Sequence, residues 1–325
     1  MEPYESKIAP GIPRTGNPVF DRMTQVFLFL GHLASPRPPT PAEPESMSDA
    51  DLRHGCCSLA CGLVNDLGPI VQASFSGSAV DDPKWHHPWP TTVEMTIRQL
   101  FMMSLDAFGT ASIVMEQNAS AACLGNIRTA AECHVYIRWV LDGREAAEQR
   151  SRAIALTSAA LKYALSSVGH WERNAVGQDA SSIAHHFKNV IIETKTDLAD
   201  LAKQRELTIP NIPAATALFD SYLPGAYFMF ALLSNIGSHA LPFPSFYGDP
   251  GTGSLIWDFK GLNVERSYFI TQACEIQLAT CKLTAPVCGW SGYEDLLARV
   301  EERLNLLAEE ASKRLRARRD PTGRW

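Results

Sequence analysis

The feature that most constrains this chain is the stretch Ser120–Leu141, which is apolar on every face of a helix but carries Arg128 and Glu132. At 100° per residue, these two charges lie four positions apart on one face. A helix that is apolar all round is normally central to its domain, and charges on it are paired or functional. We therefore expect a central helix with no solvent-facing side, on which Arg128 and Glu132 pair.

Apolar residues at helical spacing recur along the rest of the chain. They form stripes between Leu52 and Ile70, between Ile270 and Cys281, and between Tyr293 and Ala311. The alternation of apolar and polar residues that marks strands is almost absent. The pattern predicts an all-α fold, a multi-helix bundle of about seven to eight helices in a single main domain.

Two capping boxes mark helix starts, since Thr91 is followed by Glu94 and Ser291 by Glu294. They predict one helix through Met115 and a last helix that packs through Leu297, Val300, Leu304 and Leu307. Further helices are expected over 144–170, 181–202 and 222–240.

The proline content divides the chain. Residues 1–47 are expected to be a mobile N-terminal extension with a short helix over 20–33 that docks on the main body. Five prolines between 35 and 44 make a linker. The helical domain is then 48–319, and 320–325 is expected to be a disordered tail.

Charge and cysteine usage narrow the class of protein. A net charge of −6 and a pI near 5.9 exclude a surface built wholly for nucleic acid. Nothing indicates DNA specificity, although the basic run from Lys313 to Arg324 offers a local footprint for RNA. Eight cysteines in 325 residues, without a secretion signal at the N-terminus, predict a reduced cytoplasmic protein. The uncharged stretch 221–248 is interrupted by prolines and is too short to span a membrane.

Most catalytic and metal-binding signatures are absent from the sequence. It has no Glu-x-x-His pair, nucleophile elbow, Walker loop or dinucleotide fingerprint. His54, Cys57 and Cys61 share a helix face but lack a second cluster, so we expect the two cysteines to be core residues and expect neither a metal nor a cofactor.

An aromatic loop is the first candidate binding site. Trp85, His87 and Trp89 lie between prolines and offer stacking surfaces for a ring-shaped ligand, with the loop 241–262 as a second wall. The alternative is that these aromatic side chains simply pack on the domain.

A second candidate is the pair Arg128 and His134. Their spacing falls in the Arg-x4–6-His pattern of the HEPN ribonucleases, in which the Arg holds a backbone phosphate and the His moves the 2′-hydroxyl proton. Thr129 stands where that family usually has Asn, Asp or His.

The same region resembles a family of uncharacterised bacterial helical proteins, many of them actinobacterial. Their marks are an Arg-x-x-x-Glu helix that ends in Trp-Leu-Asp, and a later helix with Tyr, Ser and His. The matching residues here are Arg128, Glu132, Trp139, Asp142, Ser234 and His239. Some members are grouped loosely with HEPN-like folds. The resemblance implies a cluster of Arg128, Glu132 and His239 where two central helices cross.

These observations leave three hypotheses on function. The first is a structural or interaction role, with a structural polar cluster and self-association through the C-terminal helix. The second is a HEPN-like ribonuclease or defence toxin, a metal-independent endoribonuclease that uses Arg128 and Glu132 with His134 or His239. The third is a small-molecule-binding helical protein. If the cluster is buried, removing Arg128 alone should cost about 3–5 kcal/mol.

Overall fold

The computed structural model describes residues 43–77, 92–116, 120–174, 177–226 and 263–318. All regular elements in these residues are helical, as predicted: eight α-helices and one short 3-10 helix, without a strand. They are η1 Pro44–Ser46, α2 Asp49–Gly77, α3 Val93–Glu116, α4 Ser120–Leu141, α5 Ala146–Asn174, α6 Gln178–Gln204, α7 Ala215–Tyr222, α10 Asn263–Cys288 and α11 Glu294–Ala317.

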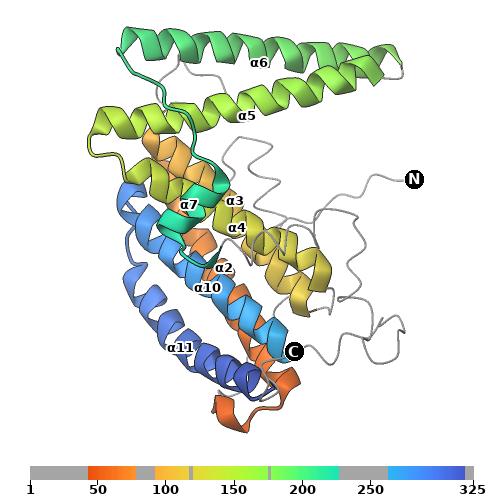
Figure 1. Cartoon of the computed structure of the whole chain (residues 1–325), viewed down its shortest axis with the longest axis vertical. Coiled ribbons are helices and arrows are strands. Elements are labelled where there is room, and N and C mark those ends of the chain that lie inside the picture. Colours follow the sequence, from red (N-terminus) through yellow and green to blue (C-terminus); the bar gives the residue numbers. More distant parts are fainter. Residues whose placement is uncertain (1–42, 78–91, 117–119, 175–176, 227–262, 319–325) are drawn as a thin grey trace.

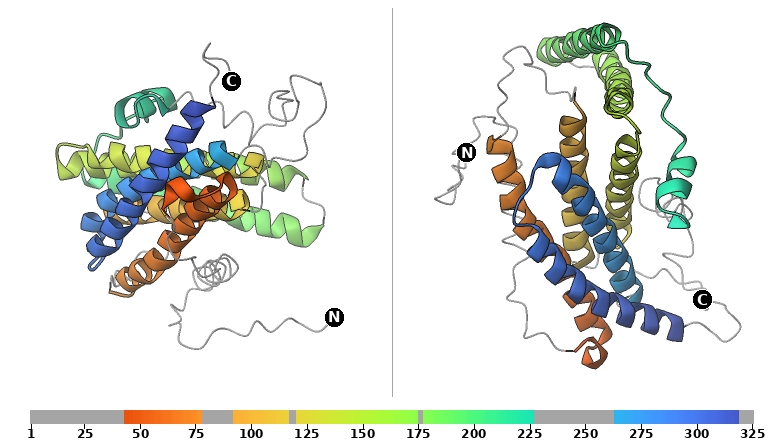
Figure 2. Two further views of the ribbon diagram at one scale, coloured as in Figure 1. Left: turned by 90° about the horizontal axis from the view of Figure 1, so that it is seen from below. Right: turned by 90° about the vertical axis from the view of Figure 1, so that its left-hand side faces the viewer.

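Five of these helices make the main body. α2, α3, α4, α10 and α11 pack together, and the antiparallel α5–α6 hairpin lies across one end of them (Figure 1). The short helix α7 lies beside α4, as the right-hand view of Figure 2 shows. No helix in the described ranges is long and apolar enough to cross a membrane.

The most central helix is α10, which packs against α2, α3, α4 and α11. Its sequence looks too polar for that position because it carries several serines and threonines. Two of their hydroxyl groups donate to carbonyls of the same helix, Ser267 to the Asn263 carbonyl at 2.8 Å and Thr280 to the Ile276 carbonyl at 2.7 Å. Polar side chains satisfied within their own helix can be buried at little cost.

α4 has a partly exposed face, so the expectation that 120–141 has no solvent-facing side is wrong. Arg138 on α4 is exposed, and the side chains of Arg128 and Glu132 are 33% and 28% exposed. The reason is that α3 and α10 cover only part of the helix, and its other face remains partly open.

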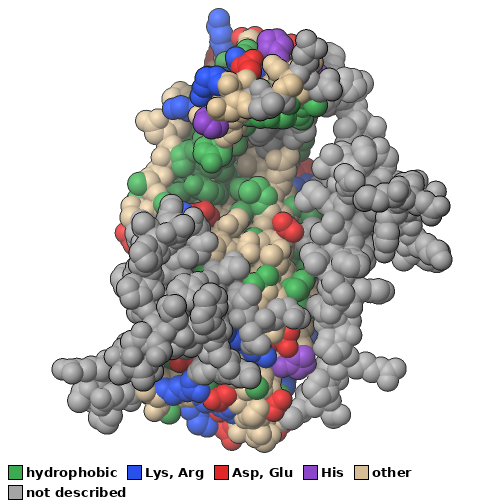
Figure 3. Space-filling model, turned by 90° about the vertical axis from the view of Figure 1, so that its right-hand side faces the viewer, with side chains coloured by type: hydrophobic (Ala, Val, Ile, Leu, Met, Phe, Trp, Pro, Cys, Tyr) green, Lys and Arg blue, Asp and Glu red, His purple; other side chains and the backbone are tan. Residues whose placement is uncertain are grey.

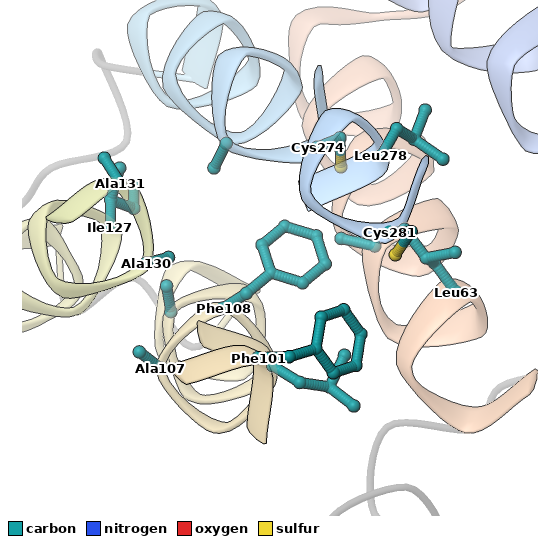
Figure 4. Close-up of a cluster of buried hydrophobic side chains, with 14 of the residues drawn as sticks. Leu63, Phe101, Ala107, Phe108, Ile127, Ala130, Ala131, Cys274, Leu278 and Cys281 are labelled. Carbon is teal, nitrogen blue, oxygen red and sulfur yellow. The ribbon is translucent and has the colours of Figure 1, made fainter. Parts of the chain in front are cut away.

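Small and large side chains alternate in the main core (Figure 4). Ala107 of α3 and Ala130 of α4 lie between these two helices, where small side chains allow the backbones to approach closely. Phe101 and Phe108 extend from α3 towards α10 and α2, and both are fully buried. Each buried phenylalanine contributes roughly 1.5–3 kcal/mol.

The two predicted helix starts have different outcomes. At the start of α3 the Thr92 hydroxyl oxygen accepts the Met95 N–H at 3.1 Å, and the predicted cap, Thr91, lies outside the described residues. Ser291 does not cap α11, whose N-cap is Tyr293 without a side-chain hydrogen bond. Gly292, with φ 71°, turns the chain between them and delays the start of the helix.

The predicted helix over 222–240 begins differently. Tyr222 is the last residue of α7, a helix that the sequence analysis did not predict. Gly225, with φ 80°, lies in the turn that follows, and left-handed backbone of this kind ends helices. The residues from 227 to 262 lie outside the described part, as do the predicted helix over 20–33, the predicted linker up to residue 42 and the tail over 320–325. The last residue of that linker, Pro44, is described and begins η1.

Candidate functional site

Arg128 and Glu132 form an ion pair on the outer face of α4, as predicted. Glu132 Oε1 lies 2.7 Å from Arg128 Nη2 and accepts from Arg128 Nε at 2.9 Å. The spacing i, i+4 brings such side chains together on any helix. Since about a third of each side chain is exposed, the pair lies at the surface of the bundle and not in its interior.

His134 lies on the buried side of the same helix, in contact with α10. Its Nδ1 is 2.9 Å from the hydroxyl oxygen of Thr280. Because the Thr280 hydroxyl donates its only proton to the Ile276 carbonyl, His134 Nδ1 must carry a hydrogen and donate. Burial, and secondly the charge of Arg138, lower the pKa of His134 to about 4, so the ring is neutral at pH 7.

The structure does not bring Arg128 and His134 together. Six positions on a helix place side chains about 120° apart, and here one side chain is at the surface while the other is 2% exposed. A phosphate bound by Arg128 would therefore not reach the His134 ring. His239, the alternative partner, lies outside the described residues.

The other residues considered for metal or ligand binding lie on α2 or outside the described ranges. His54 Nδ1 lies 2.8 Å from Glu116 Oε1, which links α2 to α3. Cys61 is buried close to this pair, and burial, then the charge of Glu116, raise its thiol pKa to about 11. Within the described ranges, no three His, Cys, Asp or Glu side chains are arranged to hold a metal ion. Trp85, His87 and Trp89 lie outside those ranges.

The basic end of the C-terminal helix is largely occupied by ion pairs. Arg314 Nη1 lies 2.9 Å from Asp49 Oδ1, and its Nε lies 2.6 Å from Glu310 Oε1. Arg318 Nη2 lies 2.6 Å from Asp49 Oδ2. Two of the arginines proposed as an RNA footprint thus tie α11 to the start of α2.

A pocket of about 340 Å³ opens where α5 begins, beside Trp139 and the connection from α6 to α7. Arg152 forms a fixed wall, because its guanidinium lies 5.6 Å from the centre of the Trp139 ring and donates to the Trp139 carbonyl at 2.6 Å. Ser151, Glu206 and Asn211 also line the pocket.

The sequence analysis included Trp139 among the residues that carry the family resemblance but predicted no pocket there. The second wall comes from 206–211, about 60 residues further along the chain. This wall lies beside Trp139 only because α6 runs back alongside α5. A local sequence pattern does not predict that packing.

The sequence analysis also missed an exposed apolar surface on the α5–α6 hairpin. Nine large hydrophobic side chains are exposed in the described residues, and five of them lie on this hairpin: Tyr163, Trp171, Ile183, Phe187 and Ile192. Figure 3 faces the free end of the hairpin, where charged and histidine side chains cover the top of the view and hydrophobic side chains lie beneath them. The available signal was the wide apolar stripe of 178–204, which one neighbouring helix cannot cover.

Comparison of the chain with protein-family models, with curated proteins and with solved structures found no match in any of the three.

Proposed function

We propose that the protein works by binding another protein chain and that the α5–α6 hairpin is its contact surface. The observation that carries this proposal is the exposed patch of Trp171, Ile183 and Phe187 on the hairpin, since the rings of Trp171 and Phe187 lie 6.4 Å apart and Ile183 precedes Phe187 by four positions. Single exposed hydrophobic residues are normal on any surface, but a contiguous apolar patch marks an interaction site.

The polar groups of α4 support an interaction role over catalysis. Arg128 is held by Glu132, and His134 is neutral, buried and bonded to Thr280. General acid–base catalysis requires a group that reaches the substrate and titrates near the working pH. The arrangement of these residues suits helix packing better than proton transfer.

A photoreactive amino acid at position 187 tests the proposal in the cells that produce the chain. We expect irradiation to give a crosslinked product of one discrete mass, with the hairpin joined to an identifiable protein. The matched control is the same amino acid at position 306, because Leu306 on α11 is similarly exposed, 44% against 50% for Phe187. Equal or absent crosslinking at both positions would refute an interaction role for the hairpin.

The pocket beside Trp139 favours a second candidate function, the binding of a small molecule. Its volume is within the lower range of ligand sites, and its wall combines an aromatic ring with hydroxyl, amide and charged groups. A ligand from a metabolite library should raise the melting temperature of the wild type but not of Ser151→Trp, which fills the pocket. No stabilising ligand specific to the wild type would remove this candidate.

A further inference from the structure

The partner of the hairpin follows from the shape and chemistry of one of its sides, which we call the apolar flank. Ile183, Phe187 and Val190 on α6 have the spacing i, i+4, i+7 and therefore share a face. Trp171 of α5 continues this face, since its ring centre lies 6.4 Å from that of Phe187. Ile183 and Phe187 are 48% and 50% exposed, and Trp171 is 40% exposed.

The flank stays exposed because the hairpin has only two helices, and each covers only one face of the other. Its own small core consists of Ile154, Leu161, Ile191, Leu198 and Leu201, separate from the main core. Ile191 and Leu198 face α5, whereas Ile183 and Phe187 lie to one side of that contact. A third or fourth helix is needed to cover that side, as in a helical bundle.

Three ionisable side chains beside the flank are paired with one another. Lys188 Nζ lies 2.6 Å from Glu172 Oε2, and His185 Nδ1 lies 3.3 Å from Glu172 Oε1. The flank itself consists of uncharged side chains. Its partner therefore has to supply apolar surface at this place.

The available area fits a modest protein interface. The residues of α5 that join the main core end near Leu156, so the section from 158 to 174 projects beyond it. That section is roughly 25 Å long at 1.5 Å per residue, and two adjacent helices are roughly 20 Å wide. Docking would cover about 500 Å² on each partner, about 1,000 Å² in total, which is the lower limit for a specific interface.

Resting on the proposed function, we infer that the hairpin binds the hairpin of a second copy of this chain, so that two copies form a four-helix bundle. The flank is itself an apolar helical surface of the kind that its partner has to supply. A two-fold arrangement covers both flanks at once, and such isologous dimers are the commonest protein assemblies. α11 is the weaker candidate for self-association, because its apolar stripe is buried against α2 and α10 and exposes only Leu306 among its large hydrophobic residues.

The native cysteines allow a direct test on the full chain, because all eight are buried. A cysteine introduced as Phe187→Cys is then the one readily accessible thiol. We expect a short bis-maleimide to link it into a species of twice the chain mass. Leu306→Cys is the matched control and should stay at single mass.

The mass of the protein in solution completes the test. By light scattering at micromolar concentration, the wild type should be a dimer. Phe187→Ser should raise the dissociation constant at least about 30-fold, as expected for an aromatic residue at the centre of an interface. Phe187→Leu, which keeps an apolar side chain, should remain largely dimeric, and an unchanged circular dichroism spectrum should show that all variants fold.

Three outcomes would overturn the inference: a monomeric wild type at 100 µM, a dimer that Phe187→Ser leaves intact, or a thiol at 187 that does not react. A monomer whose position 187 crosslinks to a different protein in cells would remove self-association and keep the interaction role. A monomer without crosslinks at 187 would remove both.

Discussion

At the scale of single residues, burial decides the role of each polar side chain on α4. Arg128 and His134 lie on the same helix and are separated by five residues. The Arg128 side chain is about a third exposed, whereas His134 is buried against α10. The two therefore respond differently to substitution and to pH.

His134 should make the stability of the protein depend on pH. Its folded pKa of about 4 lies below its ordinary value of 6.5, so between these values the unfolded chain binds a proton that the folded chain does not. The free energy of unfolding should therefore fall as the pH drops from 6.5 to 4, by about 3 kcal/mol from this residue. Urea titrations of wild type and His134→Gln across this range measure the difference. Equal pH dependence in both proteins would contradict the buried neutral ring.

The Arg128–Glu132 pair should contribute little to stability. The sequence alone suggested a loss of about 3–5 kcal/mol for removing Arg128, on the assumption of burial. Because each side chain is about a third exposed, water screens the pair, and we expect Arg128→Gln to cost less than about 1 kcal/mol. A loss above about 3 kcal/mol in urea denaturation would show that the carboxylate of Glu132 is buried after all.

At the scale of elements, the ends of the helices depend on backbone geometry that the side-chain pattern only partly reveals. α6 ends with Glu206 in the left-handed region, φ 52°, with hydrogen bonds from Glu206 N to Lys203 O and from Leu207 N to Ala202 O. This is the Schellman motif, in which glycine normally occupies the left-handed position.

Replacing Glu206 by glycine should therefore stabilise the protein, by about 1 kcal/mol, because glycine adopts this conformation without steric cost. Thermal denaturation of Glu206→Gly measures the gain. Glu206→Ala is the control, because it removes the carboxylate but keeps the strained backbone and should give no comparable increase. A drop in melting temperature for the glycine variant alone would mean that the strain is absent.

The last helix tests how far an apolar stripe predicts packing. Leu297, Val300, Leu304 and Leu307 are buried against the body, as expected from their spacing. Leu304→Asp should cost about 3–5 kcal/mol, since it creates a cavity and buries a charge. Leu306→Asp changes a residue on the opposite face of α11 that is 44% exposed, and it should change the free energy of unfolding by about 0.5 kcal/mol or less. Similar losses for both would contradict the assigned face of α11.

At the scale of the whole molecule, the described residues form two hydrophobic cores of unequal size. The main core joins α2, α3, α4, α10 and α11, whereas a small cluster holds α5 to α6. Local opening follows the number of buried apolar contacts. The hairpin should therefore open more often than the body.

Hydrogen exchange of the monomeric Phe187→Ser variant measures this difference. We expect backbone amides between 184 and 198 in α6 to exchange at least about 10-fold faster than those between 270 and 284 in α10. Equal protection would mean that the hairpin and the body unfold as one unit.

The sequence by itself determined the helical class, most of the helices and the apolar stripes of α10 and α11, because these depend on the period of residues along one helix. The Arg128–Glu132 pair followed for the same reason, since neighbours at i, i+4 meet on any helix. Only the tertiary structure decided that α10 is the most central helix and that His134 is buried while Arg128 is partly exposed. It likewise decided that 206–211 forms one wall of a pocket beside Trp139. It also decided that the apolar flank of the hairpin stays uncovered in the described part of the chain. Each of these depends on which helices become neighbours in space, and the period of a single helix carries no information about its neighbours.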